Sequence, residues 1–364
     1  MCRKIFIGAT GQHCGKTTIS LSLMHLARKR YASVGFMKPI GPKCIEYNGL
    51  IMDKDAATIA SVYNLDQDAP LMSPMTLTAG TTRRFLNGTI DAQIPRQLIC
   101  DACAKLEKRH DFLIIEGAGH GGVGSVVGVN NAQVAAMLDA PVLMVTGGGI
   151  GNVVDAVELN LPLYEREHAR VKVIMANKLV PSKREESMAY LAKAFKHRNL
   201  LVSSAFDYSR TLADPTLQHL SELLQLPLCG DPGDRSRICH TIQIGAASSQ
   251  KVIEALDDST LLIVTSSRDE LIVTASALHH IPEFRARLAG LIVAGHTPIS
   301  TITQRILVDS GIPYIRIEET TADVFALLRE HVSKIGPEDT EKIELINSTA
   351  EKFINFDAID AMLR

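Results

Sequence analysis

The stretch Thr10-Gly-Gln-His-Cys-Gly15-Lys16-Thr17-Thr18 decides how this chain folds and what it binds. It follows an apolar, strand-like run from Lys4 to Ile7 and opens a helix-like run, so backbone N–H groups, a lysine and a hydroxyl converge on one point. Gly15 lets the backbone approach an oxyanion, Lys16 can reach the β- and γ-phosphates, and Thr17 can ligate Mg²⁺. We therefore predict a nucleoside triphosphate site formed by Thr10, Gly11, Gly15, Lys16, Thr17 and Thr18.

The stretch departs from the usual phosphate-loop motif at one position. A glycine is typical five residues before Gly15, and this chain has Thr10 there, with Gly8 and Gly11 on either side. The alternative is a glycine-rich turn between strand and helix that carries a surface lysine. The Gly-Lys-Thr-Thr run favours the phosphate site, because it stands where a helix N-terminus would add its dipole and free amides.

Length and composition exclude several classes of protein. A chain of 364 residues exceeds what one hydrophobic core usually supports, so we expect two domains. With 46% hydrophobic residues, 21% charged residues and a formal net charge of −2, the chain has neither a disordered composition nor a basic footprint for nucleic acid. No apolar run reaches the roughly 18 residues that span a bilayer, and the N-terminus lacks a signal-peptide pattern. We therefore expect a cytoplasmic protein with no nucleic-acid or membrane partner.

Short apolar runs alternate with helix-period segments over the first two hundred residues. This alternation predicts a doubly wound α/β domain with a mostly parallel sheet. The expected strands are residues 4–8, 34–38, 112–116, 142–146 and 171–177. Ligands in such sheets bind beyond the carboxyl ends of the strands, so the residues that end these strands should line one crevice.

Two carboxylates are candidates for holding Mg²⁺. Glu116 ends a strand of four apolar residues and enters the turn Glu116-Gly-Ala-Gly119, which would place a hard oxygen opposite Thr17. Asp55 begins a helical stretch and could supply a second carboxylate. The alternatives are a solvated carboxylate at a strand end for Glu116 and an ordinary helix-dipole partner for Asp55.

Two further strand ends carry polar side chains. Lys38 precedes Pro39 and could neutralise an anionic substrate or a transferring phosphoryl group, although a lysine that extends to solvent is the simpler alternative. Asn177 ends the fifth strand, where its amide could read the edge of a nucleobase. Guanine-specific GTPases would need an aspartate at the position of Val180, so adenine is favoured.

The order of these elements resembles dethiobiotin synthetase and its relatives, which include cobyrinic acid diamide synthase domains. The resemblance covers residues 1–228 and rests on the phosphate loop, Met37-Lys-Pro-Ile40, Asp55-Ala, Glu116-Gly-Ala-Gly119 and Asn177-Lys178. It implies ATP-dependent activation of an oxyanion, with Lys16 and Lys38 in catalytic roles. It also implies that Gly15, Lys16 and Thr17 contact phosphate, that Thr17, Asp55 and Glu116 hold Mg²⁺, and that Lys38 binds an anion.

The second half of the chain has a pattern of its own. After the breaker-rich stretch 227–234, strand-like runs recur at residues 238–246, 261–265, 290–294 and 314–317. This half resembles the DRTGG domain, although the naming motif reads Asp234-Arg-Ser-Arg237 here. We predict a nucleotide-binding domain at 1–228, a smaller α/β domain at 229–340 and a helical segment at 341–364.

A dethiobiotin synthetase-like domain followed by a DRTGG domain resembles the N-terminal region of long phosphate acetyltransferases. Because no acetyltransferase pattern follows, we expect no acetyltransferase chemistry from this chain. The resemblance implies a regulator or sensor that binds ATP and Mg²⁺, forms a homo-oligomer such as a dimer, and takes a small anionic ligand. The alternatives are an ATP-dependent ligase of the dethiobiotin synthetase type and a degenerate domain that serves packing only.

Overall fold

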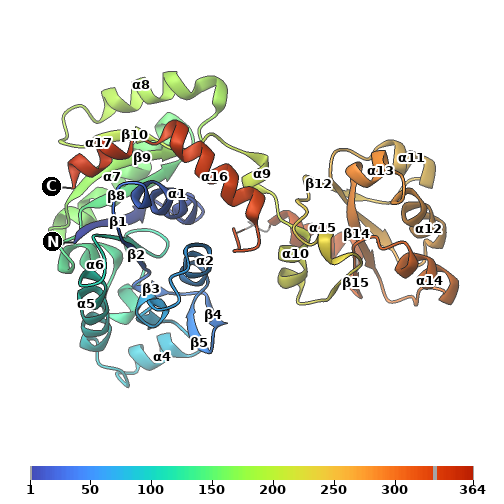
Figure 1. The fold of residues 1–364 in the computed structure, drawn as a ribbon, viewed down its shortest axis with the longest axis horizontal. Coiled ribbons are helices and arrows are strands. Elements are labelled where there is room, and N and C mark those ends of the chain that lie inside the picture. Colours follow the sequence, from blue (N-terminus) through green and yellow to red (C-terminus); the bar gives the residue numbers. More distant parts are fainter. Residues whose placement is uncertain (1, 331–333, 364) are drawn as a thin grey trace. The chain divides into compact units, whose positions relative to one another are not determined.

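The fold was examined in a computed structural model, which describes residues 2–330 and 334–363 (Figure 1). The chain divides into two compact units. The first consists of residues 1–209 together with 341–364, and the second of residues 210–340. The chain therefore leaves the first unit once and returns to it near its end. The boundary predicted at residue 228 remains a prediction.

A six-stranded sheet forms the centre of the first unit, and all of its neighbouring strands are parallel. Its order is β10-β9-β8-β1-β7-β2, as expected for a doubly wound sheet. The strands are β1 (Arg3–Ala9), β2 (Val34–Met37), β7 (Phe112–Glu116), β8 (Val142–Gly147), β9 (Val171–Asn177) and β10 (Leu201–Ser204). The five strands predicted from the sequence are confirmed within one residue at each end.

Helices cover both faces of this sheet, and the buried parts of its strands are accordingly apolar on both sides rather than alternating. Every residue of β7 is buried, including its terminal glutamate. The helices are α1 (Lys16–Arg28), α2 (Lys54–Tyr63), α3 (Ala69–Met72), α4 (Thr81–Leu86), α5 (Gln93–Glu107), α6 (Asn131–Met137), α7 (Ile150–Arg166) and α8 (Arg184–Ala194). Two 3₁₀ turns, η1 (Ser125–Val127) and η2 (Pro181–Lys183), precede α6 and α8.

Two small strand pairs lie after β2. Strands β3 (Ile40–Gly41) and β6 (Met75–Thr76) are parallel, while β4 (Cys44–Tyr47) and β5 (Leu50–Asp53) form an antiparallel hairpin. The hairpin turns through Asn48 and Gly49, which both have positive φ angles. Its second strand ends at Asp53, which caps α2 and so fixes where that helix begins.

The last two helices, α16 (Thr340–Phe353) and α17 (Phe356–Met362), belong to the first unit. Phe356 is buried and packs edge-on against Phe112, with ring centroids 5.8 Å apart. Ile359 is fully buried. The C-terminal segment therefore contributes to the core of the first unit, although more than a hundred residues of the second unit separate it from the rest in sequence.

The second unit has a five-stranded sheet in the order β11-β15-β14-β13-β12, in which only β11 is antiparallel to its neighbour. Alternate residues of the interior strand β13 join two separate apolar clusters, one on each face. The strands are β11 (Leu228–Cys229), β12 (Thr241–Ile244), β13 (Thr260–Thr265), β14 (Leu288–Ala294) and β15 (Tyr314–Ile317). The predicted strands are confirmed, except that β12 is shorter than residues 238–246.

The remaining helices of the second unit are α9 (Arg210–Ala213), α10 (Leu217–Leu224), α11 (Ser249–Glu254), α12 (Asp269–Leu278), α13 (Pro282–Arg287), α14 (Thr301–Asp309) and α15 (Thr321–Glu330), with the 3₁₀ turn η3 (Pro232–Asp234). Within residues 2–330 and 334–363, no helix of either unit is long and apolar enough to cross a membrane.

Candidate functional site

The predicted phosphate loop connects β1 to the first residue of α1. Gly15 caps α1 with a φ angle of 94°, a conformation that glycine adopts without steric cost. A Cβ at this position would lie 2.3 Å from Nδ2 of Asn177, so only glycine fits beneath that amide. The free N–H groups of the first turn of α1 therefore stand directly after a tight, glycine-dependent turn, which is the arrangement that binds phosphate.

Lys16 is nearly buried and points toward the turn that follows β7. Its Nζ donates a 2.8 Å hydrogen bond to the carbonyl oxygen of Gly119. Burial lowers the pKa of Lys16, although the carboxylate of Glu116 acts in the opposite direction. An ammonium that has lost most of its water and is held by one neutral carbonyl can interact strongly with a phosphate oxygen.

Glu116 lies at the centre of the candidate site and is fully buried. Its Oε2 accepts a 2.6 Å hydrogen bond from the hydroxyl of Ser20, and its Oε1 lies 3.4 Å from the hydroxyl of Thr17. Ser20 lies one turn after Lys16 on α1, and sequence reasoning did not single it out. The spacing of Lys16 and Ser20 along the predicted helix was the available signal, since side chains four residues apart share a face.

Lys38 does not extend to solvent but turns inward among carboxylates. Its Nζ lies 2.8 Å from Oε1 of Glu116, forms an ion pair with Oδ2 of Asp55, and lies 3.6 Å from Oδ1 of Asp53. Burial alone would lower the pKa of Lys38, but these three carboxylates outweigh it and raise that pKa well above its usual value. The structure thus brings the predicted residues Lys38, Asp55 and Glu116 into direct contact.

Asp53 is a member of the site that sequence reasoning missed. Its carboxylate accepts hydrogen bonds from the backbone N–H groups of Asp55, at 2.9 Å, and Lys43, at 3.2 Å. Burial and the neighbouring carboxylate of Asp55 raise the pKa of Asp53, while Lys38 opposes the shift. By capping α2, Asp53 fixes the position of Asp55 relative to Lys38. Its position immediately before a helix-like run was the signal in the sequence.

The donor set suits Mg²⁺ by its chemistry. Thr17, Asp55 and Glu116 offer a hydroxyl and two carboxylates, which are the hard oxygen ligands that Mg²⁺ takes alongside phosphate. Within the described ranges, no three His, Cys, Asp or Glu side chains are arranged to hold a metal ion. The ammonium of Lys38 instead lies among these carboxylates.

The other residues predicted to bind phosphate, Thr10, Gly11 and Thr18, have the following surroundings. The hydroxyl of Thr10 donates to that of Thr146 at 3.1 Å, which links the loop to the end of β8. The carbonyl of Thr18 accepts a 2.8 Å bond from Ser22 within α1. A Cβ at Gly11 would lie 3.7 Å from Sγ of Cys14, an ordinary van der Waals distance. Contacts of Thr10, Gly11 and Thr18 with a nucleotide remain predictions.

Asn177 lies beside the phosphate loop, and its amide is engaged with backbone groups. Nδ2 donates to the carbonyl of Cys14 at 2.9 Å, and Oδ1 accepts from the N–H of Phe206 at 3.1 Å. The amide therefore joins the phosphate loop to the segment after β10. Recognition of a nucleobase by Asn177 remains a prediction.

Two more buried asparagines, which sequence reasoning missed, fix the loops around Lys16. Nδ2 of Asn131 donates to the carbonyls of Ala118 and His120, both at 2.6 Å, while its Oδ1 accepts from the N–H of Ala118. Nδ2 of Asn160 donates to the carbonyl of Thr10 at 3.2 Å, and its Oδ1 accepts from Gly121 at 3.4 Å. Asn160 thereby connects the phosphate loop to the turn that carries the Lys16 acceptor.

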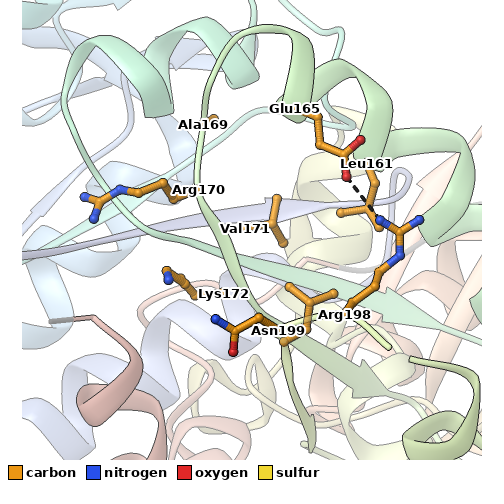
Figure 2. A pocket seen from close by; sticks show the side chains of 9 residues that line it. Leu161, Glu165, Ala169, Arg170, Val171, Lys172, Arg198 and Asn199 are labelled. Carbon is orange, nitrogen blue, oxygen red and sulfur yellow. Dashed lines mark hydrogen bonds and ion pairs between the residues drawn. The ribbon is translucent and has the colours of Figure 1, made fainter. Parts of the chain in front are cut away.

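A pocket of about 390 Å³ lies elsewhere in the first unit, where α7 ends and β9 begins (Figure 2). Its lining combines apolar side chains such as Leu161 and Val171 with the basic residues Arg170, Lys172 and Arg198. Arg198 donates to Glu165 within the pocket, at 3.1 Å. Because the phosphate loop follows the opposite, carboxyl ends of the strands, this pocket is not part of the candidate site.

Among solved structures, the chain is similar to the McdA protein of Cyanothece in complex with ATP. It has a TM-score of 0.38 and 10% identity, and the match covers 58% of this chain and 85% of that one. The CBS and DRTGG domains of the regulatory region of Clostridium perfringens pyrophosphatase match with a TM-score of 0.25 and 14% identity, over 49% of this chain and 86% of that one.

Among curated proteins, the phosphate acetyltransferase of Nitratidesulfovibrio vulgaris is 21% identical over 371 residues, which cover 100% of this chain and 52% of that protein. The enzyme of the same name from Pseudomonas aeruginosa is 22% identical over 97% of this chain and 51% of its own length. The chain thus spans about half the length of these relatives. The ATP-dependent dethiobiotin synthetase BioD of Methanocaldococcus jannaschii is 31% identical over 119 residues, 32% of this chain and 52% of that one.

Two family profiles match the chain in succession. One, described as an AAA domain, covers residues 3–220, and the other, described as a DRTGG domain, covers residues 227–331. The first match includes β1, the phosphate loop, Lys38, Asp55, Glu116 and Asn177. The chain combines a dethiobiotin synthetase-like P-loop nucleotide-binding unit with a DRTGG domain, and it is related to the N-terminal region of phosphate acetyltransferases. Since the first match covers more than half of the chain, the protein belongs to the AAA domain family.

Proposed function

We propose that this protein is a nucleotide-responsive regulator that binds ATP with Mg²⁺ in its first unit and reports the bound state through its second unit. The observation that carries the nucleotide part is the position of Lys16. Its ammonium is nearly buried, lies at the start of α1 and is held by a single carbonyl oxygen, that of Gly119. The triphosphate would take the place of that carbonyl and gain the free amides of the first turn of α1.

In this proposal Thr17, Asp55 and Glu116 hold the Mg²⁺ that accompanies the triphosphate. The ion would neutralise charge on the phosphate oxygens and fix their orientation. Gly15, Lys16 and the loop residues Thr10, Gly11 and Thr18 would contact the phosphates, and Asn177 would lie near the base. The resemblance to ATP-dependent dethiobiotin synthetase favours ATP over other nucleotides.

The regulatory part rests on the second unit and on the way the chain is connected. The DRTGG unit is inserted into the nucleotide-binding unit, because residues 341–364 return to pack against the first unit. Side chains of α16 and α17 form ion pairs with Lys29 and Arg30, at and just beyond the end of α1, the helix that begins at Lys16. Helix α1 therefore connects the phosphate loop at its N-terminus to α16 and α17, the helices that follow the second unit in the chain.

A second candidate function is an ATP-dependent ligase. The buried contact of Lys38 with Asp55 and Glu116 favours it, since a catalytic lysine for an anionic substrate has to lie beside the metal and the phosphates. In dethiobiotin synthetase the activated group is a carbamate, and a neighbouring amine attacks it. The two candidates differ in turnover, because a regulator needs only differential binding of ATP.

Phosphate release from ATP by the full-length chain separates the two functions. A regulator should bind Mg²⁺-ATP saturably and release phosphate slowly, and neither a diamine nor a diamino acid with bicarbonate should increase the rate. A marked increase that depends on those additions would favour the ligase. Lys38→Met is the control for the ligase, since it should remove any increase that depends on the amine and bicarbonate. In the same samples, sedimentation measures whether the chain forms a dimer, as the sequence led us to expect.

A further inference from the structure

Three buried carboxylates surround one ammonium in the candidate site. Asp53, Asp55 and Glu116 are each at most 4% exposed, and Lys38 is 3% exposed. Nζ of Lys38 lies 2.8 Å from Glu116 and 3.6 Å from Asp53, and it forms an ion pair with Asp55. Buried charges are tolerated when they are paired, and the ammonium of Lys38 is paired with the carboxylates of this cluster. Moving that ammonium away therefore leaves buried negative charge that another cation has to balance.

The ammonium also lies against the same oxygens that a metal ion would need. Oε1 of Glu116 is the atom that contacts both Nζ of Lys38, at 2.8 Å, and the hydroxyl of Thr17, at 3.4 Å. Asp55 is the other carboxylate proposed to hold Mg²⁺, and its Oδ2 is paired with the same ammonium. Lys38 and a divalent cation would thus compete for the same pair of carboxylates.

We propose that Lys38 is a displaceable counter-ion of the metal site: its ammonium holds Asp55 and Glu116 together until a divalent cation enters, and the cation then moves it off these carboxylates. Metal entry exchanges one positive charge for two among the carboxylates. The displaced ammonium becomes available to an anionic oxygen of a bound ligand, such as a phosphoryl or carboxylate group. This inference rests on the proposed function only in placing the cation at Thr17, Asp55 and Glu116.

The backbone around Lys38 is held firmly, so the exchange involves the side chain. The N–H of Lys38 donates to the carbonyl of Met72 at 2.7 Å, and Pro39 follows. Asp55 is fixed in turn by the capping carboxylate of Asp53, which accepts the Asp55 N–H at 2.9 Å. The carboxylates keep their places while the flexible four-carbon stem of the lysine lets its ammonium move.

Mn²⁺ binding to the full-length chain without nucleotide, measured by electron paramagnetic resonance of the free ion, tests this competition. Lys38→Met removes the competing charge and keeps the length of the side chain, so it should bind Mn²⁺ about tenfold more tightly than the wild type, or better. The matched control Lys105→Met, on the exposed part of α5, should leave the affinity unchanged. Glu116→Gln should abolish the site. Equal or weaker Mn²⁺ binding by Lys38→Met would overturn the proposal.

A second measurement on the wild type does not depend on whether Lys38→Met folds. Amine-selective acetylation followed by mass spectrometry should find Lys38 protected without metal, and its modification rate should rise severalfold when Mn²⁺ is added. Lys105 should react at the same rate in both conditions. An unchanged rate for Lys38 at saturating Mn²⁺ would contradict displacement. Both experiments omit ATP, so their failure is distinct from a failure of nucleotide binding.

Discussion

Nη1 of Arg3 lies 2.7 Å from Oδ1 of Asp360, and this ion pair joins the first strand of the parallel sheet to the last helix of the chain. The same carboxylate accepts a 2.6 Å hydrogen bond from the hydroxyl of Tyr31, and Oδ2 lies 3.3 Å from Arg30. Asp360 is 1% exposed. It therefore contacts residues at the far ends of β1 and α1, the two elements whose other ends form the phosphate loop.

Asp360→Asn should destabilise the protein by about 1–3 kcal/mol at neutral pH, the usual cost of losing charged hydrogen bonds in a buried place. Burial raises the pKa of Asp360, but the hydrogen bonds from Tyr31 and Arg3 outweigh it and lower that pKa below its usual value. The stabilisation is therefore present above the unfolded-state pKa and disappears as pH falls through the folded-state pKa. Urea denaturation across this acid range should show the two proteins converging. The exposed partner Asp357→Asn should change little, and a difference that persists in acid would refute this account of Asp360.

ATP affinity should fall at alkaline pH because of Lys16. Burial lowers the pKa of the free Lys16 ammonium, whereas a bound phosphate favours the charged form and raises it. Affinity is thus complete below the free-state pKa and falls as pH rises from there toward the higher bound-state pKa, with proton uptake on binding in that range. Calorimetry in buffers of different ionisation enthalpy measures the uptake. Lys16→Arg stays charged and should lack this pH dependence, so a variant with the wild-type profile would count against the assignment.

Asn131→Ala should weaken both the fold and the site. The change leaves the N–H of Ala118 and the carbonyls of Ala118 and His120 without their partner, which costs about 1–3 kcal/mol for buried groups. The turn that carries Gly119 then loses its support, so Mg²⁺-ATP affinity should also fall severalfold. Thermal unfolding and ATP titration provide the two readouts. Asn199→Ala, at an exposed position, is the control, and equal behaviour of the two variants would show that Asn131 does not organise the site.

The folding of fragments depends on where the last two helices belong. Residues 210–340 should fold alone, whereas 1–209 should be less stable than the same fragment joined by a flexible linker to 341–364. The reason is that Phe356 and Ile359, both buried, cover apolar surface of the first unit. Circular dichroism melts of the three fragments compare their stabilities. If 1–209 and the linked form melt at the same temperature, α16 and α17 are not part of that core.

Much of the first unit could be predicted from the sequence, because strand runs such as 112–116 are short and almost entirely apolar, and local pattern specifies such strands well. The same runs indicated that Lys38 and Glu116 would lie at strand ends that line one crevice, and the sheet order, which makes β2 and β7 neighbours, brings the two into contact. The pairing of Lys38 with carboxylates inside that crevice could not be predicted. It depends on Asp53 and Asp55, which approach from a separate hairpin and helix.

The return of the C-terminal segment to the first unit was also beyond sequence reasoning. Its contacts join Arg3 to Asp360 and Phe112 to Phe356, pairs that are far apart along the chain. Periodicity predicts that a helix has an apolar face but not which distant surface covers it. The same limit applies to Asn131 and Asn160, whose partners are backbone groups that have no sequence signature.

Calorimetric titration of Mg²⁺-ATP into the full-length chain and into Lys16→Ala tests the central claim most directly. The account predicts saturable binding by the wild type, with a stabilisation of about 2.7 kcal/mol at a hundredfold excess over the dissociation constant. Lys16→Ala should keep the circular dichroism spectrum of the wild type and bind no ATP. A wild type that binds neither ATP nor ADP at millimolar concentration, or a variant that binds as well as the wild type, would contradict a nucleotide site at Lys16.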